Sequence, residues 1–330
     1  MSKRILVTGA GGFIGHHLTK HLVSKGLFVR GVDLKLPEYE ESHADEFLTL
    51  DLRLVENCRT ATNGIDEVYN LAADMGGIGY ITANHADIAT NNVLINAHML
   101  EASLKNNVSR IFFSSSACIY PQYRQLDSDV TPLKEEDAFP AAPEEGYGWE
   151  KLFSEKLFQY YFKDHGLETR IARFHNVYGP LGTYEGGKEK APAAICRKIA
   201  LANNGDTIEV WGDGKQTRSF MYIADCVDGI VRIMQSDTRE PLNLGTDALI
   251  TIDDLVDLVT SIAGKTVRKR HVMSQPQGVR GRNSDNSRLS SIMHWEPSTP
   301  LKDGLRVTYR WIESQVSNAK RPKEAASPGG

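Results

Sequence analysis

Cysteine is scarce in this 330-residue chain, which has four cysteines and no pair in the C-x-x-C spacing of zinc sites and redox motifs. We therefore expect neither a disulfide framework nor a metal centre. Unpaired thiols persist in a reducing compartment, so we expect a cytoplasmic protein. The four residues are Cys58, Cys118, Cys196 and Cys226.

The chain also has no long apolar run and no long basic run. No apolar stretch reaches the ~18 residues that cross a bilayer, which argues against a membrane protein. No long basic run is present and the net charge is -4, so nucleic acid is not an expected partner. A strand-like run begins already at Ile5, and we expect no secretion signal before it.

What is present is an alternation of short apolar runs with longer helical patterns. The composition, 41% hydrophobic and 24% charged, is that of a globular protein. Alternating strands and helices predict a Rossmann-type, doubly wound parallel sheet with helices on both faces. The expected strands are residues 4–8, 28–33, 46–50, 67–72 and 109–115, and the expected helices are residues 13–25, 54–62, 84–106 and 148–165.

The first turn between a strand and a helix reads G-x-x-G-x-x-G, with its glycines at Gly9, Gly12 and Gly15. Gly9 permits a tight turn, Gly12 lets the backbone approach a pyrophosphate, and Gly15 lets the helix pack closely. The phosphates would lie at the helix N-terminus, beside Phe13 and Ile14. A glycine triplet alone is weak, but its place between strand and helix favours dinucleotide binding.

Acidic residues end the next two expected strands. Asp33 can accept hydrogen bonds from the adenosine ribose hydroxyls and would repel a 2′-phosphate, which favours NAD over NADP. Asp51 could bind the adenine amine or cap the following helix, and the sequence leaves both interpretations open.

A Y-x-x-x-K pair, Tyr147 and Lys151, opens the last of these helices. The spacing places both side chains on one helical face. A phenol titrates near pH ~10, and a lysine ammonium with an oxidised nicotinamide nearby would lower that value enough for base catalysis. Such a pair is common by chance and carries little weight alone.

Residues 113–121 leave the fifth expected strand at its C-terminal end, where ligands of open α/β sheets bind. With the motifs above, they resemble the extended short-chain dehydrogenase/reductase family, whose members act on nucleotide sugars. The resemblance runs from about Lys3 to about Trp311 and includes residues 211–220 in the sugar-nucleotide region. It implies that Ser116 binds the reacting hydroxyl and that the cofactor is lined by Leu71, Ala72 and Ala73.

The resemblance also implies how the chain divides. An NAD-binding domain would span residues 1–180, with part of 210–245 returning to it. A smaller mixed α/β substrate-binding domain would span residues 181–316. Residues 317–330 are rich in lysine, proline, alanine and glycine, which predicts a disordered tail.

The two residues after Ser116 bear on the type of reaction. Dehydratases of the family use an Asp-Glu pair there, and this chain has Ala117 and Cys118 instead. A ketone at sugar C4 acidifies the hydrogens at C3 and C5, because the carbanion delocalises onto the ketone oxygen. Inverting those centres needs a base on one face and an acid on the other. A thiol can take the proton, and a partly desolvated lysine can return one.

Four segments, residues 74–79, 116–121, 186–194 and 278–286, resemble the branch of the family that epimerises GDP-mannose at C3 and C5. The products there are GDP-L-galactose and, from inversion at C5 alone, GDP-L-gulose, with a place in ascorbate biosynthesis. The resemblance implies substrate contacts for a set of twelve residues: Gly76, Ser116, Ala117, Cys118, Asn176, Glu189, Lys190, Ala191, Lys198, Gln216, Arg218 and Arg282.

The same resemblance assigns catalytic roles. Cys118 and Lys190 would be the acid/base pair for C3 and C5. Tyr147 would be the oxidising base, assisted by Ser116 and Lys151. Because Lys188 lies two residues from Lys190, either lysine could face the sugar.

Two other functions stay open. A C4-epimerase acting on a UDP-sugar would use the same tyrosine and lysine but no further acid/base pair. A non-catalytic NAD-sensing regulator on the same fold would tend to lack the tyrosine or the lysine, and both are present here.

The remaining features are expected to be structural. Cys58, Cys196 and Cys226 have the context of packing residues. His16 and His17 are expected to be exposed helix residues rather than ligands. Relatives pair the helix at residues 84–106 between subunits, so we expect a homodimer.

Overall fold

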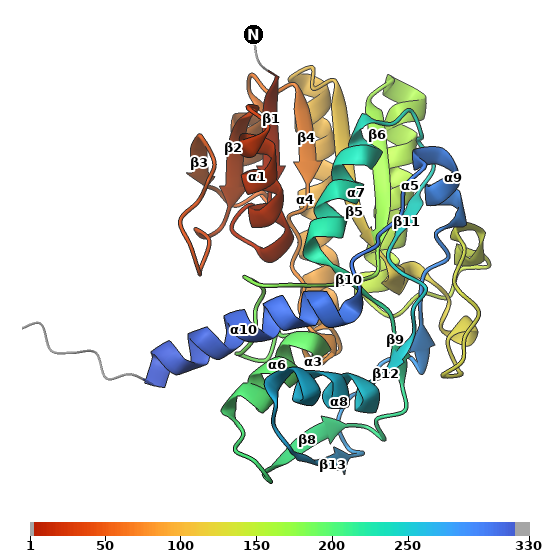
Figure 1. Cartoon of the computed structure of the whole chain (residues 1–330). Helices are drawn as coiled ribbons and strands as arrows, with labels where there is room; N and C mark the ends of the chain where they lie inside the picture. Colours follow the sequence, from red (N-terminus) through yellow and green to blue (C-terminus); the bar gives the residue numbers. More distant parts are fainter. Residues whose placement is uncertain (1–2, 321–330) are drawn as a thin grey trace, which may run out of the picture.

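The computed structural model describes residues 3–320 and is built on a seven-stranded sheet of order β11-β6-β5-β4-β1-β2-β3 (Figure 1). Every neighbouring pair in it is parallel. The order reverses between β1 and β4, and ligands of such sheets bind beyond the carboxyl ends of the strands at that point. The strands are β1 (Arg4–Thr8), β2 (Phe28–Asp33), β3 (Glu46–Thr49), β4 (Glu67–Asn70), β5 (Arg110–Ser116), β6 (Glu168–Phe174) and β11 (Leu242–Leu244).

Helices cover both faces of this sheet, which confirms the expected doubly wound fold. Along β1, Ile5 and Val7 belong to one core and Leu6 to the other, because successive side chains point to opposite faces. The first core is covered by α1 (Phe13–Ser24) and α7 (Ile223–Gln235). The second is covered by α2 (Val55–Thr62), α4 (His85–Lys105) and α5 (Tyr147–His165).

A smaller lobe has a third core, formed by α6 (Ala191–Leu201), α8 (Ile252–Ala263) and α10 (Leu301–Lys320). Figure 1 shows α10 crossing between the large sheet and this lobe. A parallel pair, β8 (Thr207–Trp211) with β13 (Arg268–Val272), lies beside these helices.

Short elements connect the two lobes. A small sheet of order β12-β9-β14 joins β12 (Ile250–Thr251), β9 (Thr217–Arg218) and β14 (Gly281–Arg282). The parallel strands β7 (Asn176–Tyr178) and β10 (Phe220–Tyr222) form a second small sheet. The remaining short elements are helices: α3 (Ile78–Ile81), α9 (Ser287–Met293) and three 3-10 helices at Ala117–Ile119, Gln122–Arg124 and Glu135–Ala138.

The loop from β2 to β3 also reaches the smaller lobe. The ring of Tyr39 lies 5.0 Å from that of Trp311 on α10 and 5.8 Å from that of Tyr184, measured between centroids. This loop therefore contacts both lobes.

Two expectations about local structure are wrong. Helix α10 continues through residues 317–320, which we expected in a disordered tail; the rest of that tail lies outside the described residues. His16 is buried rather than exposed, and His17 is half-buried, with its ring Nε2 2.9 Å from the carbonyl of Pro180.

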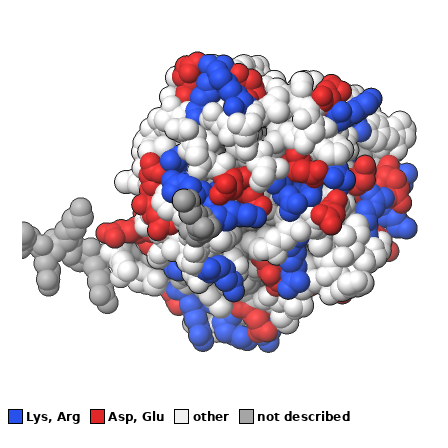
Figure 2. Space-filling view, turned by 90° about the horizontal axis from the view of Figure 1, so that it is seen from above, with Lys and Arg blue, Asp and Glu red and all other residues white. Residues whose placement is uncertain are grey.

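No helix among residues 3–320 is both long enough and apolar enough to span a bilayer. On the face shown in Figure 2, lysines and arginines are interspersed with aspartates and glutamates.

Candidate active site

The glycine turn between β1 and α1 has the backbone that a dinucleotide site requires. Gly9 has φ +70°, which favours glycine. A Cβ on Gly15 would lie 2.1 Å from the Gly9 carbonyl oxygen, so only a glycine lets α1 begin this close to the turn. Gly12 is exposed, and the first amides of α1, at Phe13 and Ile14, have no partner within the helix. These residues fit a pyrophosphate at the helix N-terminus.

Gly11 was missed by the sequence analysis. A Cβ there would lie 2.1 Å from the carbonyl oxygen of Lys35. Its amide donates to Oδ2 of Asp33 at 3.0 Å, and the amide of Leu34 donates to Oδ1 at 2.6 Å. Burial raises the pKa of Asp33, and these backbone donors oppose that shift. The carboxylate is therefore fixed at the end of β2, next to the glycine turn.

Asp51 does not cap α2, because that helix begins at Val55 with Leu54 as its N-cap residue. The Asp51 carboxylate instead accepts from the backbone amide and guanidinium of Arg53. Of the two interpretations, helix capping is excluded.

The segment that follows the carboxyl end of β4 lies against the glycine turn. The hydroxyl oxygen of Thr8 accepts hydrogen bonds from the amides of Leu71 and Ala72, both at 3.0 Å. Thr8 ends β1, so its side chain fixes the segment through Ala73 beside the glycine turn. A Cβ on Gly9 would lie 3.0 Å from the Ala72 nitrogen, which shows how close the two segments are.

The tyrosine and lysine of α5 lie at the end of β5. The ammonium of Lys151 is buried, donates to the Ser114 carbonyl at 3.0 Å and lies 5.6 Å from the centroid of the Tyr147 ring. Burial raises the pKa of Tyr147 well above its usual range, and a hydrogen bond with Ser116 lowers it. Burial also lowers the pKa of Lys151. Ionising this phenol therefore needs added positive charge, which an oxidised nicotinamide carries.

Cys118 lies beside this pair. Its sulfur accepts from Nη1 of Arg282 at 3.5 Å, and the same guanidinium binds Glu144 and, at 2.5 Å, Oε1 of Gln125. Burial raises the pKa of the Cys118 thiol, the Glu144 charge adds to that rise, and Arg282 opposes it. The Arg282 cation and the Glu144 anion thus shift the pKa of this thiol in opposite directions.

The structure separates the two candidate lysines. Lys188 is exposed, with its ammonium 3.7 Å from the centroid of the Tyr80 ring. Lys190 is half-buried at the start of α6, where burial lowers its pKa and the charges of Cys118 and Cys226 oppose the shift. Of the two, Lys190 is the lysine that is withdrawn from solvent at the start of α6.

The pKa shifts of Cys118 and Lys190 converge. A free thiol is more acidic than a free ammonium, but here burial raises the pKa of the thiol and lowers that of the ammonium. Both are groups that can take up or release a proton, as proton exchange at carbon requires.

Further predicted contacts gather around Arg282. Gln216 is buried; its amide nitrogen donates to the Trp211 carbonyl at 2.8 Å, and its Oε1 has no partner among the described residues, as expected of a group that accepts from a ligand. Arg218 donates to the carbonyls of Thr217 and Gln277 at 2.7 and 3.1 Å. Burial and Arg282 lower the pKa of Arg218 to about 10.

The other predicted substrate residues have local contacts. Asn176 donates to the Ser219 carbonyl at 3.1 Å, and Lys198 donates to the Glu209 carbonyl at 2.8 Å. Glu189 accepts from the Gly187 amide. No hydrogen bond or ion pair of the described residues joins Lys198 or Glu189 to Cys118. The small residues occupy tight positions: Gly76 against Tyr80, Ala117 in the turn after β5, and Ala191 at the first position of α6.

Glu144 and Gln125, the partners of Arg282, were not anticipated. Glu144 lies three residues before Tyr147, and its closeness to that motif was an available indication. His175 is buried, with its Nε2 3.3 Å from Oδ1 of Asn243. Burial lowers its pKa to about 3, so this ring stays neutral.

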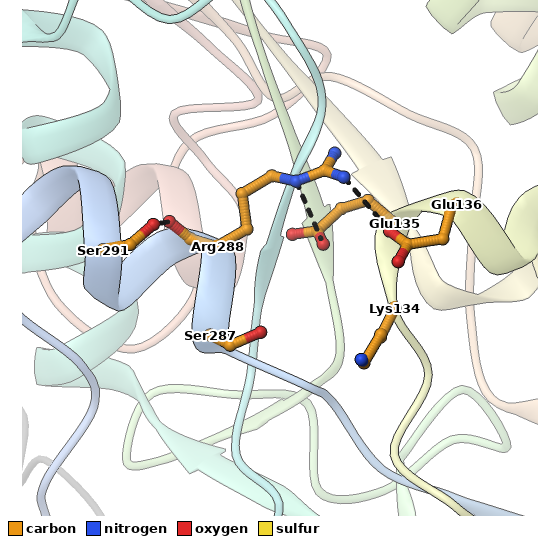
Figure 3. Close-up of a pocket in the computed structure, with 6 residues that line it drawn as sticks. All are labelled: Lys134, Glu135, Glu136, Ser287, Arg288 and Ser291. Atoms are coloured by element: carbon orange, nitrogen blue, oxygen red, sulfur yellow. Dashed lines mark hydrogen bonds and ion pairs between the residues drawn. The ribbon is translucent and has the colours of Figure 1, made fainter.

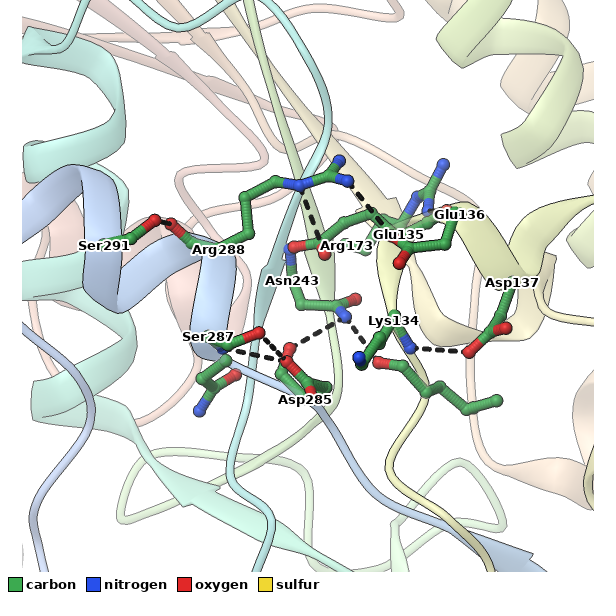
Figure 4. Close-up of polar contacts among 12 residues, drawn as sticks. Lys134, Glu135, Glu136, Asp137, Arg173, Asn243, Asp285, Ser287, Arg288 and Ser291 are labelled. Atoms are coloured by element: carbon green, nitrogen blue, oxygen red, sulfur yellow. Dashed lines mark hydrogen bonds and ion pairs between the residues drawn. The ribbon is translucent and has the colours of Figure 1, made fainter.

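A buried polar network lies behind the site. Figure 4 shows Asn243 at its centre, and its amide donates to the Leu133 carbonyl at 2.8 Å. Arg173 forms an ion pair with Glu155 at 2.8 Å, and the Glu155 carboxylate accepts a hydrogen bond from the hydroxyl of Ser115 on β5. The network ends at a surface cavity of about 300 Å³ that contains none of the predicted site residues (Figure 3). That cavity is lined by Lys134, Glu135, Glu136, Ser287, Arg288 and Ser291.

Comparisons with known proteins agree with this geometry. The profile of the NAD-dependent epimerase/dehydratase family matches residues 5–245. GDP-mannose 3,5-epimerase 1 of Oryza sativa subsp. japonica is 49% identical over 319 residues, covering 96% of this chain and 83% of that protein. GDP-mannose 3,5-epimerase of Arabidopsis thaliana is 48% identical, covering 96% and 84%. The crystal structure of UDP-glucose 4-epimerase from Thermotoga maritima superposes with TM-score 0.86 at 25% identity, covering 95% and 99%.

Proposed function

The chain belongs to the NAD-dependent epimerase/dehydratase family, and we propose that within it the protein inverts C3 and C5 of GDP-mannose to give GDP-L-galactose. The 49% identity to a GDP-mannose 3,5-epimerase across 96% of the chain supports the substrate. The observation that carries the reaction is the place of Cys118, whose amide donates to Oγ of Ser116 at 3.2 Å and whose sulfur accepts from Arg282. A thiol is thus available beside the residue expected to bind the reacting hydroxyl, and a plain C4-epimerase has no use for a further acid/base group there.

The cofactor would be held by three groups. The glycine turn and the first amides of α1 would bind the pyrophosphate, Asp33 the adenosine ribose, and Lys151 the nicotinamide ribose. NAD⁺, when bound, accepts a hydride from C4 of the sugar and later returns it, so that no net oxidation occurs.

Tyr147 and Ser116 act on the C4 hydroxyl. Tyr147 accepts its proton as the ketone forms and returns that proton at the end of the cycle. Ser116, which hydrogen-bonds Tyr147, orients the same hydroxyl. The buried ammonium of Lys151 stabilises the phenolate, because the two charges attract in a site from which water is excluded.

Cys118 and Lys190 then exchange protons at C5 and C3. One takes the proton from one face of the carbon, and the other delivers a proton to the opposite face, which inverts the centre. The sugar ring flips between the two carbons, because a single pair serves both. Inversion at C5 alone gives GDP-L-gulose as a second product.

Incubation with GDP-mannose in D₂O, followed by NMR, tests this proposal. We expect deuterium at C3 and C5 of recovered and converted sugar. Inversion at C4 without deuterium at either carbon would show a C4-epimerase, which the likeness to the Thermotoga enzyme keeps as the second candidate. Cys118→Ser should abolish the labelling while NAD binding, followed by fluorescence, is retained.

We further propose that the protein is a homodimer that works in the cytoplasm. Exposed aromatic side chains follow one face of α5, at Trp149, Phe153 and Tyr160, and the neighbouring helix α4 carries the exposed Leu94. An apolar stripe of this kind on two packed helices is typical of a subunit interface. The four free cysteines favour a reducing compartment.

A further inference from the structure

Three metal-binding side chains meet outside the active site, where cysteine spacing gave no reason to expect a metal. His16 lies in the second turn of α1, and Glu40 and His43 lie in the loop from β2 to β3. One ligand atom from each falls within 4.8 Å of the other two. We propose that His16, Glu40 and His43 bind a divalent transition-metal ion such as Zn²⁺.

One of the two known distances already matches tetrahedral coordination, and the other must lengthen when an ion binds. Zinc bonds to nitrogen and oxygen are about 2.0–2.1 Å long, so neighbouring ligand atoms of a tetrahedral site lie roughly 3.4 Å apart. Oε1 of Glu40 lies 2.7 Å from Nε2 of His16 and 3.4 Å from Nε2 of His43. The His16–Glu40 contact would have to lengthen by about 0.7 Å, and the exposed His43 and half-buried Glu40 side chains can rotate around the buried His16 to allow this. The fourth position is left for water.

Lys20 competes for the same carboxylate. Its ammonium lies 3.0 Å from Oε1 of Glu40 and partly neutralises the charge that attracts a cation. The Lys20 side chain is about half exposed, so it can move into solvent when a metal binds. Removing this ammonium should therefore strengthen metal binding, which would not follow if the ion simply met scattered surface histidines.

A metal here would cross-link two cofactor-binding elements. Helix α1 carries the glycine turn at its N-terminus, and the loop with Glu40 and His43 follows Asp33 directly. The ion would fasten the loop over α1 while leaving Cys118 and Lys190 untouched. It would thus act as a structural clamp on the adenosine side of the molecule.

The test is a titration of tag-free, chelator-treated protein with ZnCl₂ by isothermal calorimetry, in the Cys118→Ser background to remove the accessible thiol. We expect one equivalent to bind. His43→Ala should weaken binding at least about tenfold, Lys20→Met should tighten it, and the exposed control His165→Ala should leave it unchanged. At a hundredfold excess over Kd, Zn²⁺ should raise Tm by about 5 °C in the parent and not in His43→Ala.

Two results would overturn the proposal. Equal affinity in His43→Ala and its parent would place the ion elsewhere. Weaker binding in Lys20→Met would show that Lys20 supports the ion rather than competing with it. Because His43 is exposed, its replacement does not threaten folding, and failure here would leave the proposed epimerase reaction unaffected.

Discussion

At the scale of single residues, the opposed charges around Cys118 make its pKa adjustable. Glu144→Gln removes the anion that raises the thiol pKa and frees Arg282 to act on the sulfur alone. The midpoint pH for alkylation of Cys118 by iodoacetamide should therefore fall by about 1 unit. The other cysteines are buried and will react slowly.

Glu145→Gln is the matched control for that measurement. Its carboxylate is exposed and does not bind Arg282, so the alkylation midpoint should stay where it is. If the alkylation midpoint rises in Glu144→Gln, or shifts equally in both variants, then Glu144 is not the anion that raises the pKa of Cys118.

A second residue-scale prediction separates the two lysines. Lys190→Met removes the half-buried ammonium at the start of α6, the proposed partner of Cys118, and should lower the rate of epimerisation by about 10²–10⁴-fold, the usual effect of losing an acid/base group. Lys188→Met should change the rate only slightly, because that ammonium rests on the Tyr80 ring. Product formation from GDP-mannose, measured by chromatography, distinguishes the two lysines. A large loss of rate in Lys188→Met with little change in Lys190→Met would assign the acid/base role to Lys188.

The sequence was a good guide to the residues whose motifs are local and a poor one to their partners. Tyr147 and Lys151 stand four residues apart, so helical geometry predicts that they meet. Glu144 and Arg282 are 138 residues apart and meet only because β14 lies near the start of α5. No pattern within one element could have indicated that pair.

At the scale of elements, the loop carrying Lys190 depends on one glycine. The Gly77 amide donates to the Lys188 carbonyl at 3.0 Å, and a Cβ on Gly77 would lie 2.7 Å from the Glu189 carbonyl oxygen. Gly77→Ala should push this loop away, lowering activity and reducing the unfolding free energy by about 1–3 kcal/mol. Gly79→Ala meets nothing within 4 Å and should be neutral. Thermal melts and initial rates of the two variants test this prediction. Equal stability and equal activity of Gly77→Ala and Gly79→Ala would show that the loop does not depend on the close approach of Gly77 to Glu189.

Element boundaries were predicted well where buried apolar runs define them. Strand β5 was expected at residues 109–115 and spans Arg110–Ser116, because its buried side chains form one continuous run. The end of α10 was misjudged because lysine and alanine were attributed to a tail, although both favour helices. Short strands such as β9 and β14 were not predicted, since two residues carry no periodicity.

At the scale of the whole molecule, the exposed face of α5 predicts association. Phe153→Glu places a charge in the middle of the aromatic stripe, where burying it in a subunit contact would be strongly unfavourable. We expect light scattering after gel filtration to give a dimer for the parent protein and a monomer for this variant. His165→Glu, on the same helix but roughly 120–160° around its axis from the three aromatic residues, should remain dimeric. A monomeric parent protein would contradict the prediction at once.

The packing of the Tyr39 ring against Trp311 and Tyr184 has a consequence for thermal unfolding. The loop from β2 to β3 is held against the smaller lobe by these rings, so neither lobe can unfold without exposing aromatic surface of the other. Heating should accordingly give one calorimetric transition rather than two.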